Sequence, residues 1–220
     1  MLTDRDKQVI VSVGKHKALS QPQIERLHFK SYATCQRRFR RELVKNDYLS
    51  QPFYWPYGKW NRLALYRLES EGKKIYKEIT GRDYRQPAWS ENYIPHLLET
   101  NRIILELYSL VDDLWLEYRP AREAKTQLDA LLQLTNGNKL ILEVDLASET
   151  KRQLQNQFRN YQNELENYNL PANIVFFSGR SNKLYNWCLE VADKSLDVNP
   201  VFVGLNKVKQ LKEQLRRGKI

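Results

Sequence analysis

The sequence predicts an α+β protein in two parts: a small helical domain with a hairpin, followed by an α/β domain built on a mixed sheet. The first observation behind this prediction is the placement of charge. Residues 1–86 hold 19 Lys and Arg against 9 Asp and Glu, whereas residues 87–220 hold 17 of each, so the whole net charge of +10 lies in the first part. The second observation is hydrophobic spacing, which is helical near the N-terminus and alternates between strands and helices from residue 114. This separation is typical of a polyanion-binding domain beside a neutral one.

The boundary between the two parts is predicted in the stretch GRDYRQPAWSE, residues 81–91, which contains Gly and Pro and lacks apolar periodicity. We therefore expect a first domain over residues 1–80, a linker over residues 81–91 and a second domain over residues 92–220. At 220 residues the chain is long enough to bury a substantial core.

Composition excludes several classes of protein. No apolar run approaches the roughly 20 residues that a membrane-spanning helix needs, and the charged start MLTDRDKQVI lacks the apolar centre of a signal peptide. Cys35 and Cys188 are too few for a disulfide framework, and His16, His28 and His96 do not have the spacing of zinc ligands. We therefore expect a cytoplasmic protein with no membrane partner.

The first three helices are predicted from capping residues. Thr3 can cap the first helix, and Ser20 forms a capping box with Gln23 at the start of the second. Ser31 can cap the third helix, YATCQRRFRRELVKN. Three of its residues stand four apart on the expected buried side: Cys35, Phe39 and Leu43.

Two short helices joined by a tight turn, the second one polar and basic, predict a helix-turn-helix. Its third helix would present these residues to DNA: Ser31, Tyr32, Thr34, Gln36, Arg37, Arg40 and Arg41. Arg and Gln can make paired hydrogen bonds to guanine and adenine in the major groove, and Ser31 and Tyr32 suit phosphate contacts. The alternative is that RRFRR is only a solvated face. Within this pattern we expect double-stranded DNA as the partner.

A hairpin is predicted directly after the third helix, which would make the domain a winged helix. Two β-prone runs flank WPYGK, where Pro56 and Gly58 favour a turn, and Lys59 and Arg62 could reach a DNA backbone or the minor groove. The hairpin aromatics fit a hydrophobic cover or a dimer contact better than base stacking: Phe53, Tyr54, Trp55, Tyr57 and Trp60. A short helix from residue 69 to residue 79 should follow, with Ile75 and Ile79 on one face and Gly81 at its end.

The second part alternates predicted strands and helices, as expected for a mixed sheet with helices against its faces. Strands are expected at LWLEYR, LDALLQL, KLILEVDL, NIVFFS and VFVGL. Helices are expected at NYIPHLLETNRIILELYSLV, SETKRQLQNQFRNYQNELENY, NKLYNWCLEVAD and NKVKQLKEQLRR. His96 in the first of these helices fits a packed, hydrogen-bonded histidine better than a ligand.

Acidic residues fall on one face of two neighbouring predicted strands. Alternation places Asp129 on the face opposite to Leu128, Ala130, Leu132 and Leu134, and it places Glu143 and Asp145 opposite to Leu140, Leu142 and Val144. A three-residue Asn136–Asn138 loop would set Asp129 opposite Asp145 and Leu131 opposite Glu143. Three carboxylates would then meet on one patch.

Clustered carboxylates repel one another, and a divalent cation relieves that repulsion. Mg²⁺ prefers oxygen ligands and can activate a water beside a scissile phosphate, so Asp129, Glu143 and Asp145 are candidate metal ligands. The alternative is an ordinary solvent-facing half of a sheet, on which acids are common.

The acidic spacing resembles the motif of the restriction-endonuclease-like superfamily, named PD-(D/E)xK. The resemblance implies that Asp129 and Glu143 hold Mg²⁺, that a Lys two residues after the Glu helps to position the attacking water, and that Glu117 matches an acid that often precedes the motif. Gln157-x-x-x-Tyr161 is similar to an element of the RecB-like branch, which makes Gln157 a candidate catalytic residue. The sequence departs from the pattern at two positions: Leu128 replaces Pro, and Asp145 stands where Lys is expected. Lys151 or Arg152 could supply the missing cation from the following helix.

The chain from residue 1 to about residue 165 resembles the replication-relaxation family. The segments that carry the resemblance are CQRRFRRELVKNDYL and LDALLQL followed by LILEVDLASETKRQLQNQFRNY. The family occurs on plasmids and mobile elements, which implies a role in replication or its control, with replication or mobilisation proteins as further partners.

Three functions follow from these patterns, in order of preference. The first is sequence-specific binding of double-stranded DNA, with the protein acting as a homodimer. The second is a Mg²⁺-dependent DNA endonuclease that the winged helix directs to its site. The third, favoured by the missing Lys, is a protein-interaction module built on an inactive nuclease-like fold.

Overall fold

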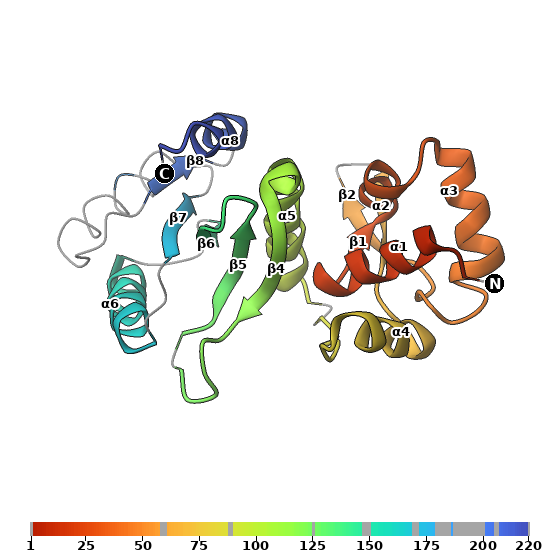
Figure 1. Ribbon diagram of the computed structural model, residues 1–220, viewed down its shortest axis with the longest axis horizontal. Helices are drawn as coiled ribbons and strands as arrows, with labels where there is room; N and C mark the ends of the chain where they lie inside the picture. Colours follow the sequence, from red (N-terminus) through yellow and green to blue (C-terminus); the bar gives the residue numbers. More distant parts are fainter. Residues whose placement is uncertain are drawn as a thin grey trace. The chain divides into compact units, whose positions relative to one another are not determined.

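The computed structural model describes residues 2–57, 61–87, 90–124, 126–146, 151–168, 172–178, 186, 201–204 and 207–219. The chain divides into two compact units, Met1–Trp89 and Ser90–Ile220 (Figure 1). Among the described residues, no helix is long and apolar enough to cross a membrane.

The first unit consists of helices and a small antiparallel sheet with strand order β1-β3-β2. Its elements are α1 (Asp4–Lys15), β1 (Leu19–Ser20), α2 (Gln21–His28), α3 (Tyr32–Arg38), a π-helical turn (Phe39–Leu43), β2 (Phe53–Tyr57), β3 (Asn61–Tyr66) and α4 (Ser70–Thr80). In this order, three helices precede a β-hairpin and a fourth helix follows it.

Local capping sets the helix starts. Thr3 and Ser20 each form a capping box, the first closed by Asp6 and the second by Gln23. The Ser31 side chain accepts a hydrogen bond from the Thr34 N–H, and α4 ends at Gly81, where φ is +70°. The helix starts predicted at Thr3, Ser20 and Ser31 are therefore confirmed.

The buried side of the third helix runs through Cys35, Phe39 and Leu43, which are all almost completely buried. In a regular α-helix, residues four apart drift by about 40° around the axis at each step. Here the Val44 N–H bonds the Phe39 carbonyl at 3.0 Å, a five-residue spacing that defines a π turn. The wider turn reverses the drift and keeps Leu43 on the same side as Phe39. Tyr66 of β3 packs edge-on against Phe39, with ring centroids 4.6 Å apart.

Helix α4 differs from its prediction in the residues that it buries. Tyr76 is 4% exposed, whereas Ile79 is 48% exposed, so the face that carries Ile75 and Ile79 is not the most buried face of the helix. Gly72 is also buried and lies directly against the backbone of Tyr48. The buried face of α4 is therefore the one that carries Gly72 and Tyr76.

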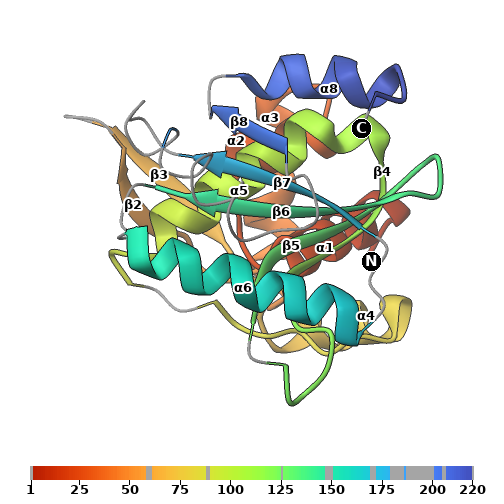
Figure 2. The ribbon, with the colours of Figure 1, turned by 90° about the vertical axis from the view of Figure 1, so that its left-hand side faces the viewer.

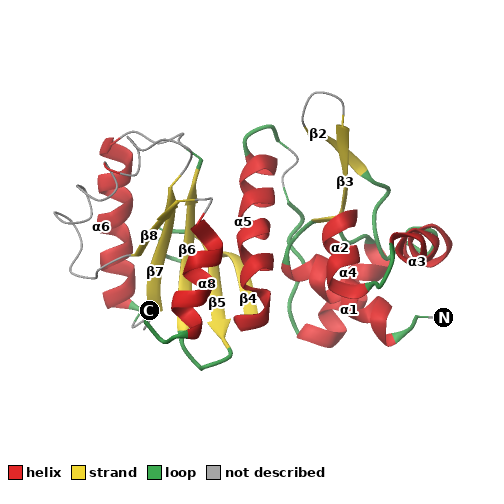
Figure 3. Ribbon diagram, turned by 90° about the horizontal axis from the view of Figure 1, so that it is seen from above, coloured by secondary structure: helices red, strands yellow, loops and turns green. Residues whose placement is uncertain are grey.

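The second unit is a five-stranded mixed sheet with helices on both faces, as Figures 2 and 3 show. Its elements are α5 (Tyr93–Leu107), a 3-10 turn (Tyr108–Leu110), β4 (Val111–Tyr118), β5 (Leu128–Leu134), β6 (Lys139–Asp145), α6 (Lys151–Asn167), β7 (Ala172–Ser178), β8 (Val201–Gly204) and α8 (Val208–Arg216). Strands β4, β5 and β6 pair antiparallel, and β6, β7 and β8 pair parallel. The predicted α+β class is confirmed. Of the helix predicted at residues 182–193, the structure describes only residue 186, which is helical.

The core of the second unit lies between the sheet and helices α5 and α8. Leu132, Leu140 and Leu142 on the sheet pack with Ile103 of α5 and Leu211 of α8. This is the apolar face that alternation predicted. Helix α6 lies against the other face, where Phe158 and Tyr161 are almost completely buried (Figure 3).

The register of the β5–β6 hairpin differs from the predicted one by two residues. Ala130 pairs with Leu142, and the Leu134 N–H bonds the Asn138 carbonyl at 2.8 Å, so the loop is Thr135–Gly137. Gly137 has φ of +88°, and glycine adopts this left-handed conformation without the strain that a side chain would add. The predicted Asp129–Asp145 and Leu131–Glu143 pairings are therefore wrong. An even shift preserves the side of the sheet, so the acids still share one face.

Candidate functional site

Helix α3 and the π turn carry three exposed arginines: Arg37, Arg40 and Arg41. None of them forms an ion pair with another described residue. Ser31 and Tyr32 are also exposed, and Thr34 and Gln36 are half-buried. The Gln36 amide donates to the Tyr32 hydroxyl at 3.0 Å, which orders two polar side chains along one edge of the helix. The predicted DNA-contact residues of this helix are therefore all at least partly exposed.

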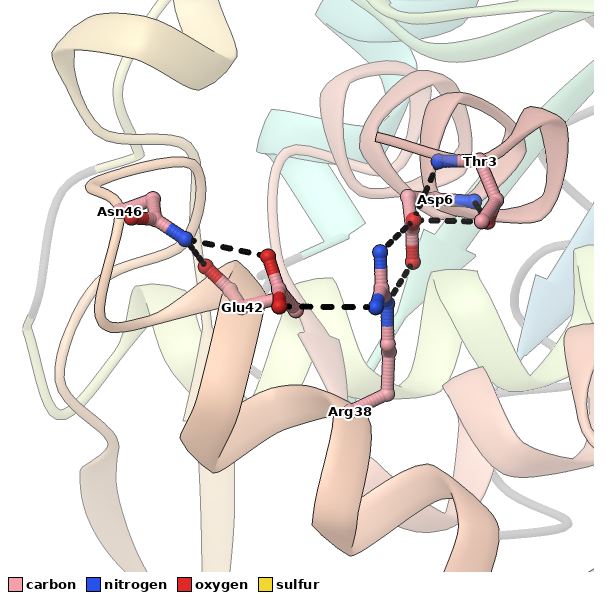
Figure 4. Close-up of polar contacts among 5 residues, drawn as sticks. All are labelled: Thr3, Asp6, Arg38, Glu42 and Asn46. Atoms are coloured by element: carbon pink, nitrogen blue, oxygen red, sulfur yellow. Dashed lines mark hydrogen bonds and ion pairs between the residues drawn. The ribbon is translucent and has the colours of Figure 1, made fainter. Parts of the chain in front are cut away.

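Arg38, in the same basic run, has a different role. Its guanidinium donates to both carboxylate oxygens of Asp6, at 2.8 Å from Nε and 2.6 Å from Nη2, and lies 3.7 Å from Glu42 (Figure 4). The Asp6 side chain is only 1% exposed, and it also accepts hydrogen bonds from the backbone and the hydroxyl of Thr3. This cluster fastens the third helix to the start of α1.

The charge state of Asp6 follows from these contacts. Burial raises the pKa of its carboxyl group, but hydrogen bonds from Arg38 and Thr3 outweigh burial and lower the pKa below its ordinary value. Asp6 is therefore ionised at neutral pH and holds Arg38 as a charged pair. Sequence reasoning missed Asp6 as a partner, although its position three residues after Thr3 is that of a capping box.

The hairpin contributes one described residue to the predicted DNA surface. Arg62 on β3 is exposed, and it lies opposite Pro56 of β2. Lys59, at the predicted tip, lies outside the described residues. The aromatic residues Phe53 and Tyr54 are 36% and 56% exposed.

Asp129 lies at one end of β5, where the β5–β6 ladder stops. Its carboxylate accepts a hydrogen bond from the Val144 N–H at 2.7 Å. His96 of α5 approaches the same place: its Nε2 lies 3.1 Å from Asp129 Oδ2 and 2.9 Å from the Val144 carbonyl oxygen. Both of these partners are acceptors, so Nε2 carries a hydrogen. Burial lowers the pKa of His96, but the Asp129 carboxylate outweighs burial and leaves the pKa above its ordinary value.

Glu143 and Asp145 on β6 are buried, at 1% and 6% exposure. The interpretation of this face as a solvent-facing half of a sheet is therefore wrong, because α6 lies against it. Tyr161 of α6 is hydrogen-bonded to Glu143, and the Gln157 amide donates to the Tyr161 hydroxyl at 2.6 Å. Burial, followed by the charges of Glu143 and Asp129, raises the pKa of Tyr161 well above its ordinary value. Its hydroxyl is thus protonated and donates to the Glu143 carboxylate.

A pocket of about 520 Å³ lies at this end of β5 and β6. Four predicted site residues contribute to it: Asp129, Glu143, Asp145 and Gln157. His96 and Tyr93 of α5 also line the pocket, and sequence reasoning assigned neither of them to a site. Lys151 begins α6, but its side chain lies outside the described part of the chain.

Within the described ranges, no group of three or more His, Cys, Asp or Glu side chains is arranged to hold a metal ion. The three predicted carboxylates share a pocket without converging on one point. The reason is that Asp129 is held by His96 and the Val144 N–H, while Glu143 is bonded to Tyr161. Glu117 on β4 is engaged elsewhere, because its carboxylate accepts a hydrogen bond from the Tyr93 hydroxyl at 2.5 Å.

The fold and the two sites define a two-unit protein with helices and a β-hairpin in the first unit and an acidic pocket beside a mixed sheet in the second. The sequence matches the replication-relaxation family over residues 10–174, and the chain belongs to this family. No curated protein sequence matches the chain.

Three solved structures are similar to the chain at low sequence identity. EndoMS in a complex with double-stranded DNA is 14% identical, with a TM-score of 0.32 over 70% of this chain and 64% of its own. The restriction endonuclease FokI bound to DNA is 12% identical, with a TM-score of 0.37 over 99% of this chain and 45% of its own. A repair endonuclease from Pyrococcus abyssi is 12% identical, with a TM-score of 0.30 over 71% of this chain and 64% of its own. The chain thus spans less than two thirds of each of these proteins.

Proposed function

We propose that the protein binds a specific site on double-stranded DNA through helix α3 and the π turn that follows it. The observation that carries this proposal is that the arginines of the run RRFRR, residues 37–41, differ in their contacts. Arg38 is fixed to Asp6 inside the domain, while Arg37, Arg40 and Arg41 point outward without ion-pair partners among the described residues. Such a surface suits phosphate and base contacts from a helix that is held at a fixed angle.

The alternative of an ordinary solvated face fits less well. A solvated helix commonly interleaves acids with bases, so that its exposed charges form pairs at three- or four-residue spacing. Here the acid in the run, Glu42, lies against Arg38 and not against the exposed arginines. The excess positive charge of the whole chain also lies in this unit.

Membership of the replication-relaxation family supports a role in DNA replication or its control. We propose that the site lies on the plasmid or mobile element that encodes the protein, and that two copies bind it as a homodimer. A replication or mobilisation protein would then be recruited to the bound site. A two-fold symmetric site is expected of such a dimer.

The test of the binding proposal is selection of bound duplexes from a random-sequence library, followed by footprinting on the host element's DNA. We expect enrichment of one sequence, and protection of that sequence on the element. Binding of every duplex with equal affinity would contradict site recognition, and no binding at low salt would contradict DNA binding altogether.

A second candidate function is a Mg²⁺-dependent DNA endonuclease, favoured by the burial of Glu143 and Asp145 in one pocket with Asp129. Their carboxylate oxygens are the ligand type that Mg²⁺ prefers, once Asp129 is released from His96. A bound ion would supply an activated water and stabilise charge on a phosphate. Gln157 and Tyr161 position Glu143 from α6, and Lys151 is the candidate cation for the role of the missing Lys.

The endonuclease is tested by incubating supercoiled plasmid with the protein and Mg²⁺ or Mn²⁺. If the pocket is a nuclease site, the parent nicks the plasmid and Asp129→Ala or Glu143→Ala reduces the rate at least 10²-fold, as loss of a catalytic group commonly does. Asp112→Ala is the matched control, because Asp112 is an exposed acid of β4 outside the pocket. Equal nicking by parent and both pocket variants would identify a contaminating nuclease. Absence of nicking with either metal would leave DNA binding as the function.

A further inference from the structure

A cleft of about 610 Å³ lies between the start of α1 and the third helix. Arg37 and Arg41 line it from the third helix, and Arg5 lines it from α1. All three side chains are exposed. The guanidinium of Arg5 lies over the ring of Phe29, with its central carbon 5.5 Å from the ring centroid. This cation–π contact holds the Arg5 side chain in place beside the cleft.

The charges around the cleft are not balanced. Asp6 and Glu42 also line it, but both lie against Arg38. Asp4 is then the acid that remains to oppose Arg5, Arg37 and Arg41. Arg38 carries one positive charge against Asp6 and Glu42, so the cleft as a whole holds four guanidinium groups and three carboxylates, a net charge of +1. An anion with several acceptor oxygens would complete the arrangement.

The arrangement of the third helix separates the arginines into two edges. Arg37 and Arg41 stand four residues apart and face the cleft. Tyr32, Gln36 and Arg40 follow one another at the same spacing, and the Gln36–Tyr32 hydrogen bond marks their edge. Arg40 and Gln36 do not line the cleft. The two edges can therefore meet different parts of one DNA molecule.

We propose that this cleft binds a backbone phosphate of DNA, with Arg5 as a contact additional to Arg37 and Arg41, while Arg40 and Gln36 face the base edges. This inference rests on the proposed DNA binding and assigns part of it to helix α1. The arginine fork matches the oxygens of a phosphate, and a phosphate contact carries no sequence preference. Arg5 therefore contributes to affinity for every duplex, whereas Arg40 contributes to the choice of sequence.

The test is fluorescence anisotropy with a labelled duplex of the selected sequence and one of scrambled sequence, each titrated at several salt concentrations. Arg5→Ala is expected to weaken binding roughly tenfold on both duplexes. The slope of log affinity against log salt should fall by about 1, as it does when one phosphate contact is lost. Arg40→Ala should reduce the ratio of the affinity for the selected duplex to the affinity for the scrambled one. Asp4→Asn, which removes the opposing carboxylate, should tighten binding to both.

Lys7→Ala is the matched control, because Lys7 is an exposed cation of the same helix that does not line the cleft. It should change affinity less than Arg5→Ala does, and thermal melting of each variant should show that the domain is folded. Arg5→Lys should restore the salt slope, since it keeps the charge. Binding by the parent with equal effects of Arg5→Ala and Lys7→Ala would overturn the cleft site alone. Failure of the parent to bind any duplex would overturn the proposed function as well.

Discussion

Replacing Arg37 and Arg40 together by alanine will abolish detectable duplex binding at moderate salt. Each arginine can make charge-assisted hydrogen bonds worth about 1.5–3 kcal/mol. Loss of both should lower affinity by roughly 10²- to 10⁴-fold if the contributions add. Both side chains are exposed and form no ion pair with a described residue, so the domain should remain folded. A gel-shift titration with the selected duplex measures the effect.

The control for this variant is the loss of two arginines elsewhere. Arg216 and Arg217 are exposed at the end of α8 and just beyond it, so Arg216→Ala with Arg217→Ala removes the same charge from the second unit. We expect this control to bind within a few-fold of the parent. Equal losses in the two double variants would show that only net charge matters, and unchanged affinity of the first would remove the third helix from the DNA surface.

Replacing Arg38 by methionine will destabilise the first unit by about 3 kcal/mol, near the lower end of the range for breaking a buried ion pair. The Asp6 carboxylate is 1% exposed, so it would lose its charged partner in a place that water scarcely reaches. Arg38 itself is 27% exposed, which places the expected effect at that lower end. Urea unfolding followed by circular dichroism measures the change in the free energy of unfolding.

Arg40→Met is the matched control, because it makes the same substitution two residues away on the exposed surface. It should change stability by less than about 0.5 kcal/mol. Asp6→Asn combined with Arg38→Met should recover part of the loss, since the buried charge is then absent. Equal stability of the Arg38→Met and Arg40→Met variants would show that the Asp6–Arg38 pair does not hold the helix.

The same pair predicts a dependence of stability on pH. The pKa of Asp6 in the folded protein lies below its ordinary value of 3.8. Its stabilising contribution is therefore present in full above pH 3.8 and is lost as the pH falls through the lowered pKa. The Asp6→Asn variant should not show this loss of stability at low pH, because it has no carboxyl group to protonate at this position. Parallel melting curves of the parent and the variant over this pH range check the difference.

Features that depend on local sequence were predicted correctly. The helix starts at Thr3, Ser20 and Ser31 follow from side chains that cap the next turn. The apolar face of β5 and β6 follows from alternation along each strand. Both rules act over a few residues, so a single sequence contains all that they need.

Features that depend on distant contacts were not predictable in this way. The inward orientation of Arg38 depends on Asp6, 32 residues earlier, and periodicity alone does not separate it from its arginine neighbours. His96 meets Asp129 across 33 residues, and burial of Glu143 depends on the position of α6. The register of the β5–β6 hairpin differs from the predicted one because Gly137 takes the left-handed conformation at the end of the loop. The loop is therefore Thr135–Gly137, one residue earlier than the predicted Asn136–Asn138.

The π turn at Phe39–Leu43 has a consequence for how this helix can vary between relatives. A π turn amounts to one residue inserted into an α-helix. The insertion keeps Arg40, Arg41 and Glu42 between the core residues Phe39 and Leu43, whereas a regular helix can place its next inward residue after either two or three others. Deletion of one residue in this turn would shorten the outer surface yet still leave Leu43 able to reach the interior. Relatives that differ in length by one residue here would therefore differ in the outer surface of this helix and share the same packed interior.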